Sequence, residues 1–340
     1  MSRSVAILGA TGLVGRTLLG VLEERGFEAE APRLLATEGA GRTLDFRGRS
    51  WPVEAVRPDI FDGVEIAFFT CANDVSVAWA PVARAAGTRV VDNSSAFRYV
   101  DAVPLVVPEV NGDLLDSRPP LVANPNCSTI AIVLALAPLA RAVGIERVQV
   151  ATYQSVSGAG SEALEELEHG IRGGLEGDPP ARPGGAPPFA FNVVPQIDRF
   201  EENGYTREEM KVVWETRKIL GLPDLPMAVT AARVPVRVGH SAAVAVTLRT
   251  PLEPAEARSL WSAWPGIEVV DDPAAGRFPT PLMVAGRDAV LVGRARRDLS
   301  DPRGLLFWVV SDNLRKGAAT NAVQIAERMA APAGRGGKTA

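Results

Sequence analysis

Cys127 is the residue whose type and setting point most directly to chemistry. It stands in the run Asn124-Pro125-Asn126-Cys127-Ser128-Thr129, and an apolar segment rich in Ala and Leu follows to about Arg141. Asn-Pro-Asn disfavours helix and the apolar segment favours it, so the thiol is predicted at a helix N-terminus. The helix dipole and its unpaired N–H groups favour the nucleophilic thiolate there. The polar neighbours indicate a nucleophile, although a lone cysteine is more often a small buried apolar side chain.

A cysteine that attacks an acyl group needs a nearby acid or base whose pKa lies near neutrality. The chain has two histidines. His169 lies in the acidic stretch Glu165–Gly170, which is typical of a solvated helix end, whereas His240 lies between glycine and serine at an expected strand end. By elimination His240 is the better catalytic candidate, and a buried structural histidine is the alternative.

The N-terminal glycine turn predicts a dinucleotide site. The apolar strand Val5–Leu8 leads into glycines at 9, 12 and 15, and then into an amphipathic helix that ends at Gly26. Such glycines let the backbone turn tightly and approach a pyrophosphate at the helix N-terminus. The spacing is a weak signal alone, and its position between a strand and a helix strengthens it.

The segment after the next expected strand, Arg33–Ala36, bears on the choice between NAD and NADP. An acidic residue usually binds the ribose 2′-hydroxyl at this point in NAD-binding folds. Here the segment is Thr37-Glu38-Gly39-Ala40-Gly41-Arg42. Thr37 and Arg42 suit a 2′-phosphate, and Glu38 would repel one if it pointed inward. The residues alone leave both cofactors open.

The order of the expected elements predicts two domains. Strand patterns at 64–70 and 89–92 alternate with a helix at 74–86, which favours a parallel doubly wound sheet. Beyond the cysteine helix the pattern favours an antiparallel α+β domain, with strands and helices expected at 147–156, 162–171, 206–220, 227–237, 241–249, 289–293 and 305–310. A last helix, from 312 to about 330, is assigned to the first domain. We therefore expect residues 1–126 plus 311–340 as the dinucleotide-binding domain and 127–310 as the catalytic domain.

Composition excludes several classes of protein. The 340 residues are 46% hydrophobic with a net charge of -4, which is typical of a globular chain long enough for two domains. Two cysteines are too few for a disulfide framework and fit a reducing compartment, and Cys71 is interpreted as a packing residue. We see no signal peptide and no long apolar run, so we expect a cytoplasmic protein without a membrane span. The absence of basic clusters argues against nucleic acid.

Motifs spread over nearly the full chain resemble the aspartate-β-semialdehyde dehydrogenase family. In order, they are Gly9–Gly15, Asp92–Arg98, Asn124–Thr129, Thr152–Gly160, Glu208–Lys211, Arg233–Ser241 and Ser311–Ala319. The resemblance implies an α/β protein with an N-terminal Rossmann-type doubly wound sheet. It also implies a second α+β domain for catalysis and dimerisation, similar to the C-terminal domain of glyceraldehyde-3-phosphate dehydrogenase, in a homodimer or homotetramer.

The reaction that the resemblance implies is a reductive dephosphorylation. NADPH and L-aspartyl-4-phosphate would give L-aspartate-4-semialdehyde, phosphate and NADP, in lysine (through diaminopimelate), threonine and methionine biosynthesis. Cys127 would form the acyl thioester, and His240 would shuttle the proton on the thiol and the thiohemiacetal oxygen. The Asn126 amide would stabilise the oxyanion. Gln154 would orient the acyl group, and no metal is expected.

The resemblance also assigns partners to the charged groups of the substrate and to the cofactor. Arg233 matches the ligand of the α-carboxylate and Glu208 that of the α-ammonium. Arg98 and Lys211 match the phosphate site. Outside the motif, Glu208 and Lys211 would be an ordinary i,i+3 ion pair. Cofactor contacts are implied for Gly9, Thr11, Gly12, Leu13, Val14, Gly15, Thr37, Ser157, Gly158 and Asn313.

One segment departs from the family pattern. Ser-x-Arg-Ser-Ala-Gly is common after the second strand, with its arginine on the 2′-phosphate, and residues 37–42 lack that arginine. NADP is the expected cofactor, with NAD or dual use as the alternative and Arg42 as a possible substitute; Arg237 is taken as structural. The competing enzymes are N-acetyl-γ-glutamyl-phosphate reductase, whose cysteine motif differs, and glyceraldehyde-3-phosphate dehydrogenase, whose Ser-Cys-Thr-Thr-Asn motif is absent. A silent Rossmann scaffold is the alternative from another class.

Overall fold

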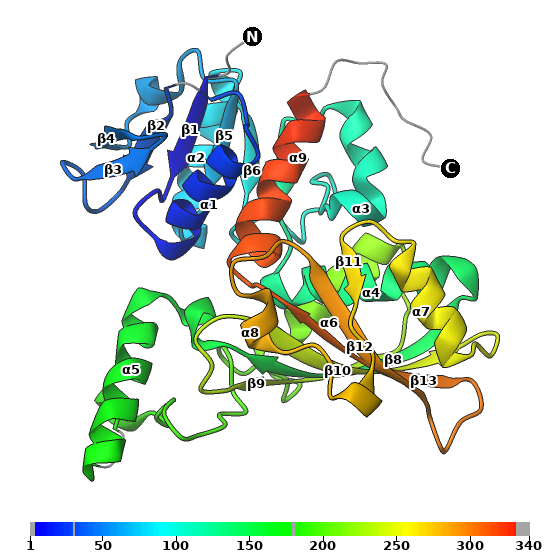
Figure 1. Ribbon diagram of the computed structural model, residues 1–340. Coiled ribbons are helices and arrows are strands. Elements are labelled where there is room, and N and C mark those ends of the chain that lie inside the picture. The colour runs from blue at the N-terminus through cyan, green and yellow to red at the C-terminus, as the bar shows by residue number, and fades with distance from the viewer. Residues whose placement is uncertain (1–3, 30, 179–180, 331–340) are drawn as a thin grey trace. The chain divides into compact units, whose positions relative to one another are not determined.

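The computed structural model describes residues 4–29, 31–178 and 181–330, which form two compact units (Figure 1). One unit contains the chain up to Pro125 together with the part that begins at Ala318, and the other contains Asn126–Gly317. The chain thus returns to the first unit at Ala318 and not at residue 311, so Asn313 lies in the second unit.

The first unit is built on a seven-stranded sheet of order β3-β4-β2-β1-β5-β6-β7. Its strands are β1 Val5–Leu8, β2 Arg33–Ala36, β3 Thr43–Phe46, β4 Arg49–Ala55, β5 Ile66–Phe69, β6 Arg89–Asp92 and β7 Leu121–Ala123. Neighbouring strands pair in parallel, apart from the antiparallel β3–β4 hairpin. The central strands β1 and β5 are buried along their length, as in parallel sheets covered on both faces. The predicted Rossmann-type sheet is confirmed.

The helices of this unit are α1 Leu13–Glu24, α2 Asn73–Ala85, α3 Pro108–Asn111 and α9 Thr320–Ala330. Apolar side chains of α1 and α9 share one core with the sheet. The sequence predicted that the last helix begins at Asp312, but α9 begins at Thr320. A π-helical turn, Arg315–Ala319, precedes α9, and the Asp312 carboxylate accepts the N–H groups of Leu314 and Arg315 just before it. Those bonds stabilise a turn in place of regular helix.

The second unit contains a six-stranded sheet of order β11-β12-β13-β10-β8-β9. Its strands are β8 Ile145–Gln154, β9 Met227–Arg233, β10 His240–Leu248, β11 Ile267–Val269, β12 Val290–Arg297 and β13 Gly304–Ser311. The α+β class is confirmed, but the expectation of a purely antiparallel sheet is wrong at both edges. There β9 pairs in parallel with β8, and β11 with β12. The helical crossover between β8 and β9 provides the length that a parallel pairing requires.

Helices cover one face of this sheet. They are α4 Cys127–Ala142, α6 Arg207–Leu220 and α7 Pro254–Ser262. Two other helices of this unit lie elsewhere: α5 Ser161–Glu176 packs on the short turn at 156–159, and α8 Pro281–Val284 packs through Val284 on Val310 of β13. Residues 128–139 of α4 are all buried, and α4 packs on β8, β10, β12 and β13. Thr206 and Glu209 form the predicted capping box, and Gly221 ends α6 with φ +66°. No helix in the described part of the chain has the length and hydrophobicity to cross a bilayer.

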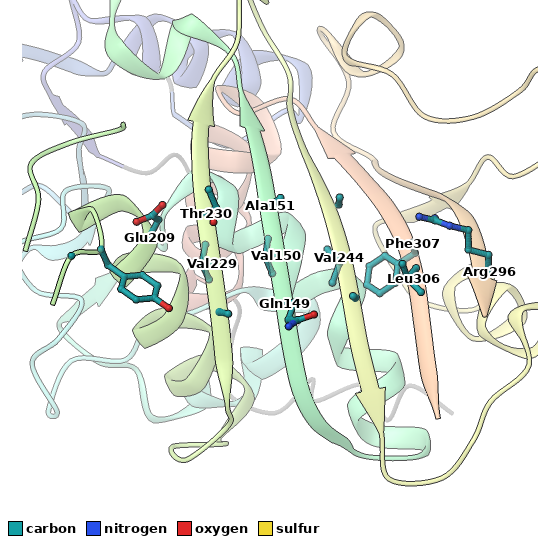
Figure 2. A pocket seen from close by; sticks show the side chains of 15 residues that line it. Gln149, Val150, Ala151, Glu209, Val229, Thr230, Val244, Arg296, Leu306 and Phe307 are labelled. Atoms are coloured by element: carbon teal, nitrogen blue, oxygen red, sulfur yellow. The ribbon is translucent and has the colours of Figure 1, made fainter. Parts of the chain in front are cut away.

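The other face of this sheet carries small, half-exposed side chains. Alternate positions of β8 and β10, such as Ala151, Ala243 and Ala245, point to this side, while Val150 and Val244 are buried. A groove of about 500 Å³ crosses it. Figure 2 shows side chains of β9, β8, β10, β13 and β12 that line this groove. A sheet face with this composition is suited to covering by another protein surface.

Trp261 of α7 anchors α4 to the sheet. Its indole Nε1 donates to the carbonyl of Ala135 at 2.8 Å, and its ring lies 5.0 Å from that of Phe307. We predict that Trp261→Phe lowers the free energy of unfolding by about 2 kcal/mol, because a hydrogen bond is lost and a cavity opens.

Urea unfolding followed by far-UV circular dichroism measures this loss. Trp264→Phe is the matched control, since Nε1 of Trp264 has no hydrogen-bond partner within the described residues. It should change the free energy of unfolding by less than about 1 kcal/mol. Equal losses in the two variants would contradict the anchoring role of Trp261.

Candidate functional site

Cys127 is the first residue of α4, as the sequence predicted. Asn126 is the N-cap, and its Oδ1 accepts the N–H groups of Ser128 and Thr129 at 2.9 and 3.2 Å. The thiol is half-buried. A Cβ added at Gly317 would lie 3.1 Å from Cys127 Cβ, so the backbone at Gly317 approaches Cys127 closely. The cap therefore fixes the thiol at the positive end of a long buried helix.

Two carboxylates of α6 hold the remaining polar groups of Asn126. Its backbone N–H donates to Glu215 Oε2 at 2.6 Å, and its Nδ2 donates to Glu208 Oε1 at 2.9 Å. Gln154 Nε2, from the end of β8, reaches the same Glu208 oxygen at 3.2 Å. Glu208 is 5% exposed. The structure thus brings Asn126, Gln154 and Glu208 into one hydrogen-bonded group beside the thiol.

Lys211 completes the charge balance of Glu208. Its Nζ lies 3.2 Å from Glu208 Oε2 and 2.8 Å from Asp198 Oδ2. Burial works to lower the pKa of Lys211, but the two carboxylates hold that pKa above its ordinary value. The i,i+3 ion pair exists, yet it is largely buried and not on the exposed helix face that such a pair usually occupies. Sequence reasoning missed Asp198, which no motif contains.

Arg233 ends β9 and is 7% exposed. Burial lowers the pKa of its guanidinium, and the negative charges of Glu208 and of a Cys127 thiolate oppose that effect. Its Nη1 donates to the Ser155 carbonyl at 2.7 Å, which is the one hydrogen bond that the guanidinium makes within the described residues. A buried guanidinium with unused N–H groups is suited to a carboxylate ligand.

His240, the first residue of β10, is 3% exposed. Its Nδ1 lies 3.0 Å from both the backbone nitrogen and the hydroxyl of Ser155. Its Nε2 is buried and has no hydrogen-bond partner within the described residues, as is also true of Ser128 Oγ, and both residues line a small cavity. Burial, together with the charge of Arg233, holds the pKa of His240 well below its ordinary value. The imidazole is therefore neutral near neutral pH.

Gly158 lies close to His240, and Asn313 forms hydrogen bonds with residues next to it. A Cβ at Gly158 would lie 3.0 Å from Arg233 Nη1 and 3.2 Å from His240 Nε2. Asn313 Oδ1 accepts from the Gly239 N–H at 3.0 Å and lies 2.9 Å from Ser155 Oγ. Asn313 Nδ2 donates to Ser157 Oγ at 2.9 Å. Ser157 and Asn313 are thus hydrogen-bonded to each other next to Ser155 and Gly239.

In the first unit, the glycine turn leads from β1 into α1. Gly9 has φ +92°, and a Cβ at Gly15 would overlap the Gly9 carbonyl oxygen. Gly12 is the exposed N-cap of α1, followed by the half-exposed Leu13 and Val14. Backbone N–H groups at such a turn fit a pyrophosphate.

Arg42 lies alongside this turn. A Cβ added at Gly39 would lie 3.6 Å from Arg42 Nε and 3.7 Å from the methyl of Thr11. Arg16, which sequence reasoning missed, donates from Nε to the Thr11 carbonyl at 3.0 Å. Thr37 directly follows β2. Two guanidinium groups therefore accompany Thr11 at the edge of the dinucleotide turn.

Arg98 also belongs to the first unit and is buried. Its Nε donates to the Asn124 carbonyl at 2.9 Å and its Nη2 to the Asn93 carbonyl at 2.7 Å. Lys211, the other expected phosphate ligand, lies in the second unit. Each of the two cations is fixed in place by its own unit.

The structure also places Cys71, Arg237 and His169, which the sequence analysis interpreted as a packing, a structural and a surface residue. Burial raises the pKa of Cys71 to about 11, and its Sγ lies 3.5 Å from Ser76 Oγ. Arg237 forms an exposed ion pair with Glu168, and His169 is exposed. The described ranges contain no cluster of His, Cys, Asp or Glu arranged to hold a metal ion.

Comparison with known proteins gives the same result for both units. The family described as "Semialdehyde dehydrogenase, NAD binding domain" matches residues 4–118, and "Semialdehyde dehydrogenase, dimerisation domain" matches residues 136–316. The aspartate-semialdehyde dehydrogenase of Legionella pneumophila is 50% identical over 333 residues, which cover 96% of each chain.

Solved structures agree. Aspartate semialdehyde dehydrogenase II of Vibrio cholerae, complexed with ASA, has a TM-score of 0.93 at 46% identity and covers 97% of this chain and 98% of its own. The aspartate semialdehyde dehydrogenase with NADP from Candida albicans has a TM-score of 0.76 at 25% identity and covers 97% and 98%. The chain therefore belongs to the aspartate-semialdehyde dehydrogenase family of oxidoreductases.

Proposed function

We propose that the chain reduces L-aspartyl-4-phosphate with NADPH to L-aspartate-4-semialdehyde, releasing phosphate and NADP, through a thioester on Cys127. The observation that carries the proposal is the thiol at the capped N-terminus of α4, beside buried groups of both charges. Acyl transfer to a thiol uses such a positioned thiolate. The reaction would serve lysine (through diaminopimelate), threonine and methionine biosynthesis in the cytoplasm, where the two free cysteines would stay reduced.

The residues around Cys127 suit an amino-acid acyl phosphate. The unused N–H groups of Arg233 would bind the α-carboxylate, and Glu208 would bind the α-ammonium. Gln154 would orient the acyl group. The Asn126 amide, which has a second N–H beyond the one on Glu208, would contact the carbonyl oxygen. Lys211 and Arg98 would bind the phosphate.

The first unit would bind the nicotinamide cofactor, which supplies the hydride that reduces the thioester. The turn formed by Gly9, Gly12 and Gly15, together with Thr11, Leu13 and Val14, would hold the pyrophosphate. Ser157, Gly158 and Asn313 would contact the nicotinamide end. Thr37 and Arg42 would bind the 2′-phosphate, and this pairing favours NADP.

We further propose that a second copy of the chain covers the open face of the second sheet (Figure 2). The match to a dimerisation domain and the small side chains on that face support a homodimer, or a homotetramer built from such dimers.

We predict that Cys127→Ala lowers the phosphate-dependent reduction of NADP by aspartate semialdehyde at least about 10³-fold, because the nucleophile is lost. Cys71→Ala, the matched control, should retain most of the activity. The readout is NADPH absorbance. Residual turnover in Cys127→Ala comparable with wild type would refute the thioester route.

We predict that Arg42→Ala raises the KM for NADPH about tenfold or more and leaves the KM for NADH unchanged, since it removes a charge from the 2′-phosphate. Calorimetric binding of 2′-AMP should weaken in parallel. Arg49→Ala, which changes an exposed arginine at the start of β4, is the control. An equal effect on both cofactors, or none, would rule out this role.

We predict that Ala243→Arg dissociates the oligomer, because a long charged side chain would stand in the middle of the proposed interface. Light scattering coupled to size-exclusion chromatography gives the mass. Ala85→Arg, at an exposed position of α2, should leave it unchanged. A wild-type monomer, or an unaltered oligomer in Ala243→Arg, would show that this face is not the interface.

A further inference from the structure

We propose that Glu215 of α6 is a positioning residue for Cys127, because its carboxyl group closes the N-terminal cap of α4. It would take the place that a glutamate of the helix's own first turn holds in an ordinary capping box. Glu215 lies outside the motifs that carry the family resemblance. The inference rests on the proposed function, since it concerns how the same nucleophile is held.

Two other helices of the second unit show how such a cap is closed locally. In α6, the N–H of the N-cap residue Thr206 donates to Oε2 of Glu209, the third residue of the helix, at 2.6 Å. In α7, the N–H of the N-cap residue Glu253 donates to Oε2 of Glu256, again the third residue, at 2.9 Å. In both helices the carboxylate therefore comes from the first turn of the helix that it caps.

The first turn of α4 offers no such carboxylate. Its third residue is Thr129, and it contains no acidic side chain. Thr129 Oγ1 is buried and makes no hydrogen bond inside the described ranges. The N–H of the N-cap residue Asn126 must therefore find its acceptor elsewhere, because a buried N–H without one is costly.

Glu215 supplies that acceptor from a helix 89 residues further along the chain. Its Oε2 accepts the Asn126 N–H at 2.6 Å, the same distance as in the local pair of α6. The residue is fully buried, and α4 packs against α6. The cap of α4 is thus a capping box whose carboxyl half comes from another helix.

This arrangement links the nucleophile to the helix that would bind the substrate. Glu208 and Glu215 are seven residues apart, about two turns along α6, so they lie on one face of it. Each accepts a hydrogen bond from Asn126. A displacement of α6 would therefore move the cap, and with it the thiol of Cys127, which is the next residue.

Alkylation of Cys127 distinguishes a cap from a simple charge. In a Cys71→Ala background iodoacetamide reports on Cys127 alone, because the chain has two cysteines. We expect Glu215→Leu to slow the reaction at pH 7 about threefold or more, since a frayed first turn no longer directs its N–H groups at the thiolate. Removal of a nearby negative charge would instead favour the thiolate. An unchanged or faster reaction would therefore overturn the proposal.

Glu209→Leu is the matched control, because it removes a buried carboxylate of the same helix whose hydrogen bonds go to Thr206 and Ala231. It should lower the free energy of unfolding and leave the alkylation rate within about twofold. Glu215→Gln keeps an oxygen acceptor and should keep kcat within about threefold. Glu215→Leu should lower kcat about tenfold or more with little change in KM. Equal losses in the two Glu215 variants, or equal slowing of alkylation in Glu209→Leu, would refute the positioning role.

The hydrogen bond itself is observable by NMR in the unsubstituted protein, so this test does not depend on how well the variants fold. Pro125-Asn126 is the one Pro-Asn pair in the sequence. Proline labelled with ¹³C at its carbonyl and asparagine labelled with ¹⁵N therefore select the Asn126 amide. We expect its proton well downfield of ordinary amides and protected from exchange, because it donates to a carboxyl oxygen over a short distance. An ordinary shift with rapid exchange would overturn the proposal.

The spectrum and the alkylation need no substrate, so this inference and the proposed function fail independently. A downfield, protected amide and slower alkylation of Glu215→Leu in a protein without turnover would support this inference and contradict the proposed function. Turnover through Cys127 in a protein whose Asn126 amide exchanges rapidly would do the reverse.

Discussion

Capping of α4 by Asn126 is the interaction on which the site depends. Asn126 Oδ1 accepts the first N–H groups of the helix. Its backbone N–H donates to Glu215, and its side-chain amide donates to Glu208. The cap orients the thiol and ties α4 to α6 through buried carboxylates. Loss of a cap usually costs about 1 kcal/mol, and the larger effect here would be on geometry.

The buried charged groups around that cap differ in how many of their hydrogen bonds are satisfied. Glu208 forms an ion pair with Lys211 and accepts hydrogen bonds from the amides of Asn126 and Gln154. Arg233, by contrast, has one carbonyl partner within the described residues. Leaving such a cation under-satisfied is costly unless a ligand completes it. The arrangement therefore favours a substrate that brings a carboxylate to Arg233, and this preference follows from burial and not from net charge.

Much of this could be predicted because local patterns determine it. Val5–Leu8 and the glycine turn predict strand, turn and helix, and the structure has them; Asn-Pro-Asn before Cys127 likewise marks the start of α4. The β3–β4 hairpin was missed because β3 has four residues, β4 contains a proline, and most side chains of both strands are exposed or half-exposed, so neither strand shows a buried apolar run. The parallel edges of the second sheet depend on pairing between distant segments, which no local pattern encodes.

In the site, too, some residues could be predicted from the local sequence and others could not. Cys127 and His240 follow from residue type and neighbours, but the roles of Ser155 and Asn313 around Nδ1 depend on contacts between residues about 75 to 160 positions apart. Asp198 on Lys211, and Arg16 and Arg42 beside Thr11, likewise become visible only once the chain is folded. Side chains that support a reactive group carry no signature of their own in the sequence.

The central claim is that Cys127 carries the acyl group, and peptide mass mapping tests it most directly. The protein is mixed with L-aspartyl-4-phosphate in the absence of nicotinamide and quenched in acid. The account predicts an aspartyl adduct on the peptide that contains Cys127, removable by hydroxylamine as expected for a thioester. No adduct in a protein that turns over when NADPH is added, or an adduct on Cys71, would contradict it.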